Sequence, residues 1–381
     1  MRPIWENENK PPGDIPPTAP TTDITANEGI KGDEGFIETT QPPLEGSATR
    51  PPEDPSNPSD PEVKKGLKGL ALSLTKLNEE EKAIPHLETF LKTQPYDKEA
   101  LWAIYSAYIK IGEREKAAIY LERLSMLEPS NMALQEQLAL MKRENRVERG
   151  FQSKEASHFV VRFDGKENID LGHLISIILE EAYIKVGADI GYYPDDRIGV
   201  VLYTQEEFRD VTRSPSWAGA IYDGRIKIPA GGITTRTALL ERVVFHEYTH
   251  ALVHRLSKNR APVWLNEGLA QHEEGSRSSS PEKANIIDQI ARLVAQGQTI
   301  PLYKLEGSFM GLNQEAAMVS YALSLSVTEY IIKEFGISAV KRILEKLGNG
   351  KTLEAAIQGS LSISYQDLNK GWLSNLKRRV S

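Results

Sequence analysis

The sequence predicts an α+β protein preceded by an α-helical repeat segment. Strand-like and helix-like patterns alternate from about residue 151, and the chain then reads as helical from about residue 230 to its end. Residues 62–148 instead show a helical pattern that repeats every 34 residues. With 381 residues, 40% of them hydrophobic, the chain is long enough for two or three domains with real cores.

Residues 1–61 are expected to be a disordered leader. Thirteen of the 22 prolines fall in this segment, among threonine, aspartate, glutamate, serine and glycine. Such a composition buries too little apolar surface to offset the entropy lost on ordering. The segment is interpreted as a spacer, with a proline-rich ligand for a partner domain as the alternative.

The segment 62–148 predicts paired helices. Pro95 and Pro129 are 34 residues apart, and at the same offset several small and apolar residues recur: Ala83 with Ala117, Leu87 with Leu121, Leu70 with Ile104. This spacing resembles tetratricopeptide repeats, and the resemblance implies a protein partner as a possibility. A further helical stretch at 132–146 is expected to cap or dock the two repeats.

The third region, 151–381, mixes both kinds of element. Residues 157–163 and 197–203 have the alternation or apolar run of strands, and 171–191 has helical apolar spacing ending at a glycine. Residues 218–229 (AGAIYDGRIKIP) predict a hairpin that turns at Asp223-Gly224, because Asp-Gly is a favoured turn pair.

The chemistry is expected on the helix RTALLERVVFHEYTHALVHRL (236–256). Within it, His246 and His250 are four residues apart, so both imidazoles lie on one helix face, a turn apart. That spacing suits one Zn²⁺ ion. Glu247 follows the first histidine and can flank the metal without binding it, where it would take a proton from the attacking water.

A catalytic zinc needs a third protein ligand, and Glu267 in WLNEGLAQHEEG is the candidate. Asn259, Arg260 and Pro262 are expected to end the motif helix and turn the chain. A second helix from about Val263 would then return Glu267 to the metal. Gly268 is expected to let the motif helix and the second helix approach closely.

HEYTH followed by WLNEGLA resembles the gluzincin metallopeptidases, and most closely the peptidase MA-like metallohydrolases. The resemblance covers about 150–381. It implies a zincin-like domain with a small mixed sheet and a helical lobe, and a peptide or protein substrate. It implies zinc held by His246, His250 and Glu267, and Glu247 as the general base. It also implies that the strand before the motif helix lines the cleft.

Several further residues are candidates for the same site. The resemblance suggests a tyrosine that stabilises the oxyanion, and Tyr321 is either that residue or a core tyrosine. Tyr330 is expected in the core. His254, four residues after His250, is interpreted as a neighbour of the site rather than a ligand. Gln271 either orients Glu267 or is an ordinary polar helix residue.

Composition excludes some classes of function. A net charge of −7 disfavours nucleic-acid binding, and the absence of cysteine excludes disulfides and thiolate ligands. No run of about 18 apolar residues predicts a transmembrane helix. A cell-envelope or extracellular location is favoured over a cytoplasmic one, because the leader resembles the spacer that follows an export signal.

Two alternatives to a peptidase remain at this point. One is a catalytically silent scaffold made of the repeats and a zinc domain. The other is a zinc hydrolase that acts on a non-peptide amide or ester. The complete set of His246, Glu247, His250 and Glu267 argues against a silent domain, since binding a metal does not require Glu247.

Overall fold

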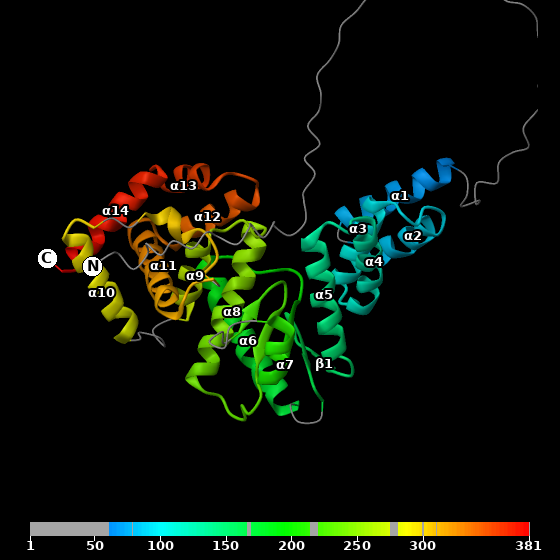
Figure 1. The fold of residues 1–381 in the computed structure, drawn as a ribbon, viewed down its shortest axis with the longest axis horizontal. Coiled ribbons are helices and arrows are strands. Elements are labelled where there is room, and N and C mark those ends of the chain that lie inside the picture. Colours follow the sequence, from blue (N-terminus) through cyan, green and yellow to red (C-terminus); the bar gives the residue numbers. More distant parts are fainter. Residues whose placement is uncertain are drawn as a thin grey trace, which may run out of the picture. The chain divides into compact units, whose positions relative to one another are not determined.

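The computed structural model describes residues 61–77, 79–165, 169–213, 220–274, 281–298, 301–309 and 311–380. The leader predicted at 1–61 lies outside this range, apart from Pro61, which begins the first helix. The described chain forms two compact units, residues 61–142 and residues 143–380 (Figure 1). We call them the N-terminal and C-terminal units. The division falls within one long helix.

The N-terminal unit is made of paired helices. They are α1 (Pro61–Lys76), α2 (Glu80–Thr93), α3 (Lys98–Lys110), α4 (Arg114–Leu127) and the first part of α5 (Met132–Val147). Helix α1 packs against α2, α2 against α3, and α3 against α4. Each begins or ends where the sequence offers a signal; Asp97, for example, caps α3 by accepting a hydrogen bond from the Ala100 amide.

The 34-residue offset matches the packing of this unit in part. Ala83 and its partner Ala117 are fully buried, as are Leu87 and Leu121. The offset fails at α1, where Leu70 is 48% exposed although Ile104 is buried. The reason is positional: α1 is the first described helix, so its outer side has no preceding helix to cover it.

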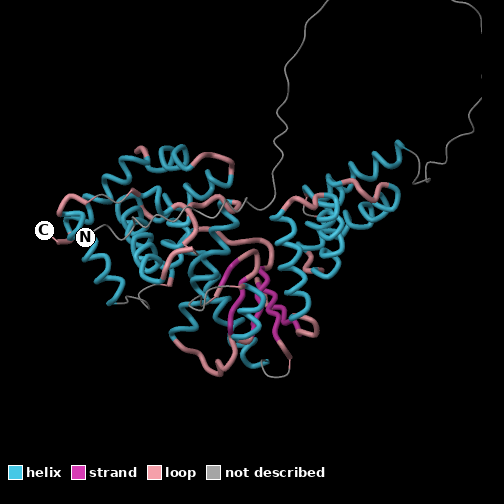
Figure 2. The backbone as a smooth tube through the Cα atoms, viewed as in Figure 1, coloured by secondary structure: helices cyan, strands magenta, loops and turns pink. Residues whose placement is uncertain are grey.

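The C-terminal unit contains a five-stranded mixed sheet in the order β1-β2-β3-β5-β4 (Figure 2). Its strands are β1 (Gln152–Glu155), β2 (Phe159–Phe163), β3 (Ile198–Tyr203), β4 (Ile221–Tyr222) and β5 (Ile226–Pro229). Strands β2, β3 and β5 are parallel, and the two outer strands are antiparallel to their neighbours. The hairpin predicted to turn at Asp223-Gly224 is confirmed as β4–β5, and Gly224 has a positive φ of 107° there.

Helices make up the rest of this unit. They are α6 (Ile169–Ile190), α7 (Gln205–Thr212), α8 (Ala238–Ser257), α9 (Val263–Glu273), α10 (Pro281–Ala295), the 3₁₀-helix η2 (Leu302–Leu305), α11 (Gln314–Phe335), α12 (Ile337–Gly348), α13 (Leu353–Leu361) and α14 (Tyr365–Arg378). The predicted helix at 171–191 is therefore confirmed as α6, whereas β1 and α7 were not anticipated.

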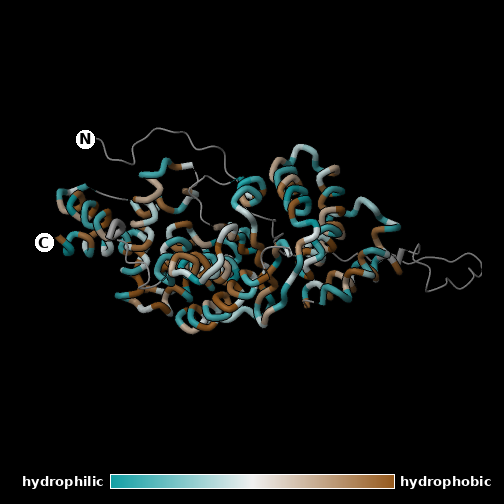
Figure 3. The backbone as a smooth tube through the Cα atoms, turned by 90° about the horizontal axis from the view of Figure 1, so that it is seen from below, coloured by the Kyte–Doolittle hydropathy of each residue, from teal (hydrophilic) through white to brown (hydrophobic). Residues whose placement is uncertain are grey.

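One face of the sheet is apolar and forms the core with α6 and α8. Alternate residues of β3 and β5, among them Val200, Leu202 and Ile228, point to this face and join one buried cluster with residues of both helices. Figure 3 shows hydrophobic and hydrophilic residues interleaved along the helices, as expected for helices with one face in a core. Because α8 lies directly on the sheet, the residues of its motif are held on a rigid support.

The prediction that Gly268 packs against the motif helix is wrong. Gly268 of α9 does allow a close approach, but the partner is α11 rather than the motif helix. A Cβ atom at this position would lie 2.2 Å from the Ser324 backbone oxygen and 2.1 Å from Thr328 Oγ1. Close packing of α9 on α11 fixes the position of α9 relative to α11, and with it the position of Glu267.

The fold class is α+β, as the sequence predicted: a small mixed sheet, a lobe of helices, and an N-terminal helical segment. None of the helices in the described part of the chain is both long enough and apolar enough to span a bilayer.

We expect Gly268→Ala to destabilise the protein by about 1–3 kcal/mol, because the added methyl group meets the α11 backbone. At this size each kcal/mol lowers the melting temperature by about 2–4 °C. Differential scanning calorimetry measures the change. Gly69→Ala in α1 is the matched control: nothing lies within 4 Å of its Cβ position, so it should leave stability unchanged or raise it. Equal melting temperatures for both variants would contradict the assigned packing.

Candidate metal centre

Two consecutive helices carry the candidate metal centre. Thr237 caps α8 by accepting a hydrogen bond from the Leu240 amide at 3.1 Å, and the helix runs to Ser257. The chain then turns through Lys258 and Asn259, both in the left-handed region, and α9 begins after Pro262. The predicted break between the two helices is therefore confirmed, and α9 packs against α8.

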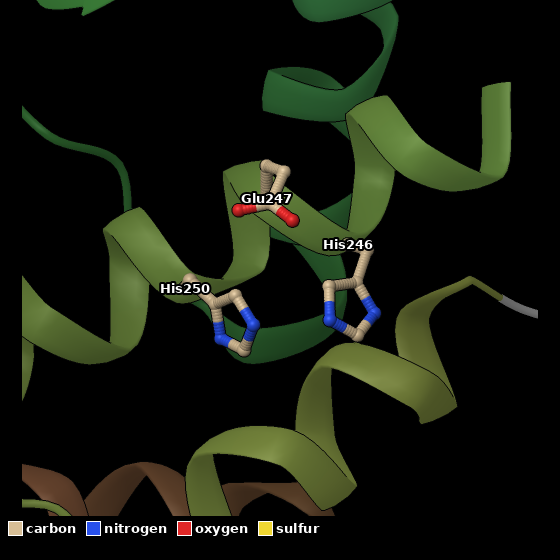
Figure 4. Close-up of side chains that lie close together, drawn as sticks. All are labelled: His246, Glu247 and His250. Atoms are coloured by element: carbon tan, nitrogen blue, oxygen red, sulfur yellow. The ribbon is translucent and has the colours of Figure 1, made fainter. Parts of the chain in front are cut away.

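His246, Glu247 and His250 lie together on α8 (Figure 4). One ligand-capable atom from each residue lies within 4.8 Å of the others. The two imidazole centroids are 4.5 Å apart with the rings perpendicular. Figure 4 shows both rings side by side, one helical turn apart, and the Glu247 carboxylate on the neighbouring side of the same helix.

Glu267 of α9 reaches the same point. Its Oε2 atom is 3.6 Å from His246 Nε2 and 3.7 Å from His250 Nε2. Two ligands of a tetrahedral zinc with bonds of about 2.0–2.1 Å lie about 3.3 Å apart. The Glu267 oxygen is therefore spaced from each Nε2 atom nearly as a shared metal ion requires, and small side-chain shifts would close the difference.

The other ring nitrogen of each histidine is fixed by a hydrogen-bond acceptor. His246 Nδ1 lies 2.6 Å from Glu274 Oε1, and His250 Nδ1 lies 2.9 Å from Asn266 Oδ1. Since both acceptors are oxygens, each Nδ1 carries the proton and donates it. When the ring is neutral, this arrangement leaves the Nε2 lone pair directed at the common point, which is the tautomer that metal binding needs.

Three carboxyl groups lie around the centre, which favours a cation. Glu247, Glu267 and Glu274 are all at least mostly buried. Burial lowers the pKa of His246, but its hydrogen bonds to Glu267 and Glu274 outweigh this and raise the pKa to about 10. Burial lowers the pKa of His250. A positive charge on His246 is thus stabilised by Glu267 and Glu274, and a divalent ion would be stabilised more strongly.

Glu247 has the environment expected of a base. It is 5% exposed, and its Oε2 atom is buried without a hydrogen-bond partner. Burial raises the pKa of Glu247 to about 8, with further increases from Glu267, Glu274 and Asp223. A buried carboxylate beside a candidate metal, with one oxygen free and a raised pKa, matches the requirements of proton transfer near neutral pH.

Tyr321 lies near both carboxylates that face the centre. Burial raises its pKa, and the charges of Glu267 and Glu247 raise it further. Its ring packs edge-on against Phe309, with centroids 5.4 Å apart. Gln271 joins the two helices here: its Nε2 donates to the backbone oxygens of Tyr321 at 2.9 Å and Glu267 at 3.2 Å. It therefore orients the backbone of Glu267 and not its carboxylate.

Two other candidates lie elsewhere. The His254 ring packs edge-on against Tyr222 of β4, with centroids 5.4 Å apart, and burial lowers its pKa. Tyr330 packs against the core and edge-on against Phe335, as expected for a core tyrosine.

Sequence reasoning missed the residues that orient the histidines. Asn266 directly precedes Glu267, and Glu274 follows it by seven residues, which places Glu267 and Glu274 on the same face of α9. Arg242 donates to the second oxygen of Glu274 at 3.3 Å. The seven-residue spacing was visible in the sequence, but only the packing of α9 on α8 shows that it faces His246.

Comparison with known proteins agrees with this geometry. Residues 179–378, just over half of the chain, match the sequence model of the Peptidase MA superfamily. The match includes α8, α9 and Tyr321, and it does not reach the helices of the N-terminal unit. A search of curated proteins found no significant match. The convergence of His246, His250 and Glu267 and the family match lead to one conclusion: the chain belongs to the Peptidase MA superfamily.

Proposed function

We propose that the protein is a zinc-dependent metallopeptidase of the gluzincin type. One observation carries the proposal: a carboxylate oxygen from α9 lies 3.6 and 3.7 Å from the two Nε2 atoms of α8. His246, His250 and Glu267 would hold the metal. Membership of the Peptidase MA superfamily supports hydrolysis of peptide bonds and a peptide or protein substrate.

The donor set fits zinc. Two imidazole nitrogens and one carboxylate are a common ligand set of hydrolytic zinc sites, in which the fourth position stays open. Both histidines are already held in the metal-binding tautomer by Glu274 and Asn266. When bound, zinc would lower the pKa of a water molecule and polarise the carbonyl group of the substrate.

Glu247 is the proposed general base. Its side chain starts one residue after His246, so it flanks the ligands, whereas Glu267 is nearly equidistant from both Nε2 atoms. Glu247 therefore has a free oxygen to take the proton from the attacking water, and it can later pass that proton to the leaving amine. A metal site built only for structure would not require this buried carboxylate.

Tyr321 is proposed to donate a hydrogen bond to the developing oxyanion. Its raised pKa keeps the hydroxyl protonated, so that it acts as a donor throughout the working range of pH. The Gln271 side chain holds the Tyr321 backbone against α9, which ties the position of this donor to the position of Glu267.

The N-terminal unit is proposed to bind a protein partner through tetratricopeptide-like repeats. The equivalence of Ala83 with Ala117 and of Leu87 with Leu121 in the packed core supports the repeat. We propose 62–148 for this segment and 151–381 for the peptidase domain. The compact C-terminal unit begins slightly earlier, at Arg143 inside α5.

Glu247→Gln tests the enzyme directly. We expect turnover to fall by roughly 100- to 10,000-fold while the protein keeps about one zinc per chain, because glutamine cannot accept the proton. Metal content is measured by elemental analysis, and turnover by digestion of a peptide library beside small amide and ester substrates. Loss of zinc in this variant would identify Glu247 as a ligand. Cleavage of the small esters alone would replace the peptidase by another hydrolase.

Glu274→Gln is expected to weaken zinc binding by about 10- to 100-fold, because it removes the charge that orients His246 and raises its basicity. Competition with a chromophoric chelator measures the affinity. Glu273→Gln is the matched control: burial raises the pKa of Glu273 to about 8, so it is largely neutral at pH 7 and glutamine resembles it. Equal affinities in the two variants would exclude the role assigned to Glu274.

Tyr321→Phe is expected to lower kcat by about 100- to 1,000-fold and to change KM little, because the lost donor acts mainly in the transition state. Steady-state kinetics on a cleaved peptide provides both constants. Tyr330→Phe removes a hydroxyl from the same helix away from the centre and should leave kcat unchanged. If both variants behave alike, Tyr321 is a core tyrosine.

A further inference from the structure

A buried network of ion pairs lies on the face of the sheet opposite α8. Lys227 of β5 is fully buried and pairs with Glu144 Oε1 at 2.5 Å and with the Asp223 carboxylate. Arg225 pairs with Glu144 at 3.2 Å and donates to both oxygens of Glu148 at 2.6 and 2.7 Å. Glu144 and Glu148 are 1% and 3% exposed.

This network is an expensive way to fill the space. Removing an ion from water costs several kcal/mol even after relaxation, and apolar side chains of similar size often stabilise a fold as well or better. Lys227 sits between Ile226 and Ile228, whose side chains fill the apolar face of the same strand. Because of this desolvation penalty, the ion pairs add little net stability. They do fix the distances and directions between the paired side chains closely.

The position that they fix is that of the β4–β5 hairpin. Arg225 in its turn and Lys227 in its second strand pair with Glu144 and Glu148, and Asp223 in the turn joins the network through Lys227. On the other side, Tyr222 packs on His254, one turn beyond His250. The hairpin is thus placed between the ion pairs and the helix that carries the metal centre.

The hairpin also supplies an edge strand of the described sheet. Strand β4 is the last strand in the order of the described sheet, and it contacts α8. An extended peptide lying over His246 and His250 would run along this edge, where main-chain hydrogen bonds set its register. A displaced hairpin would weaken these main-chain hydrogen bonds equally in the bound substrate and in the transition state, so it would weaken binding of the peptide and raise KM.

We propose that Lys227 is a positioning residue that holds the β4–β5 hairpin in register with the metal centre through its ion pairs with Asp223 and Glu144. It does not touch the substrate, and it acts through the turn. The proposal rests on the proposed peptidase function for its kinetic consequence, and on the structure alone for its effect on the hairpin.

The kinetic test compares Lys227→Met and Glu144→Gln with the wild type on one cleaved peptide. We expect kcat/KM to fall by about 10- to 100-fold through a rise in KM, with kcat within about threefold and zinc content unchanged. Glu144→Gln is the milder change and carries the test if Lys227→Met does not fold. An unchanged KM in folded variants would overturn the proposal.

Leu368→Ala on α14 is the stability control. Leu368 is fully buried and far along the chain from the hairpin, and its truncation is expected to lower the melting temperature because it leaves a cavity in the core. If KM rises in this variant as much as in Lys227→Met, the kinetic effect follows general stability and the positioning role is wrong.

Amide hydrogen exchange separates this proposal from the proposed function. Mass spectrometry should show faster exchange of residues 221–229 in Lys227→Met than in the wild type or Leu368→Ala. Equal exchange in the two variants would overturn the positioning role whether or not the protein is a peptidase. Absence of zinc-dependent cleavage by the wild type would overturn the proposed function, and the exchange result would still decide how the hairpin is held.

Discussion

The structure of the metal centre depends on the packing of α9 against α8 and α11. Helix α8 alone supplies two imidazoles and one carboxylate, and these cannot complete a ligand set in which Glu247 stays free. The third ligand, the Glu267 carboxylate, comes from α9, whose position is fixed by the contact of Gly268 with the backbone of α11. That contact leaves no room for a side chain, so α9 cannot shift along α11. The position of Glu267 relative to the two histidines is therefore fixed.

Electrostatics acts in the same sense as packing. Without a positive charge between them, the buried carboxylates around His246 would repel one another. Binding of a cation would remove this repulsion and is therefore favoured. Glu274 is itself paired with Arg242 through one oxygen, and its other oxygen holds the His246 ring. The orientation of the His246 ring therefore depends on Arg242 near the start of α8, which acts on the ring through Glu274.

The sheet contributes a second fixed element. Its apolar face supports α8, and its opposite face holds the β4–β5 hairpin by buried ion pairs. The centre thus lies between a strand held by Lys227 and a helix held by Gly268. Neither Lys227 nor Gly268 belongs to the HExxH motif, although both determine where the side chains of the motif meet a substrate.

Local patterns in the sequence determined the elements and the motif. The spacing of His246 and His250, the break before Pro262 and the Asp223-Gly224 turn each depend on neighbours within a few residues, and each is present in the structure. Long-range contacts decided the rest. The partner of Gly268, the acceptors of the two Nδ1 protons and the pairing of Lys227 with Glu144 join segments up to 83 residues apart. No periodicity records such pairs, because side-chain direction relative to another element is set only when the elements pack.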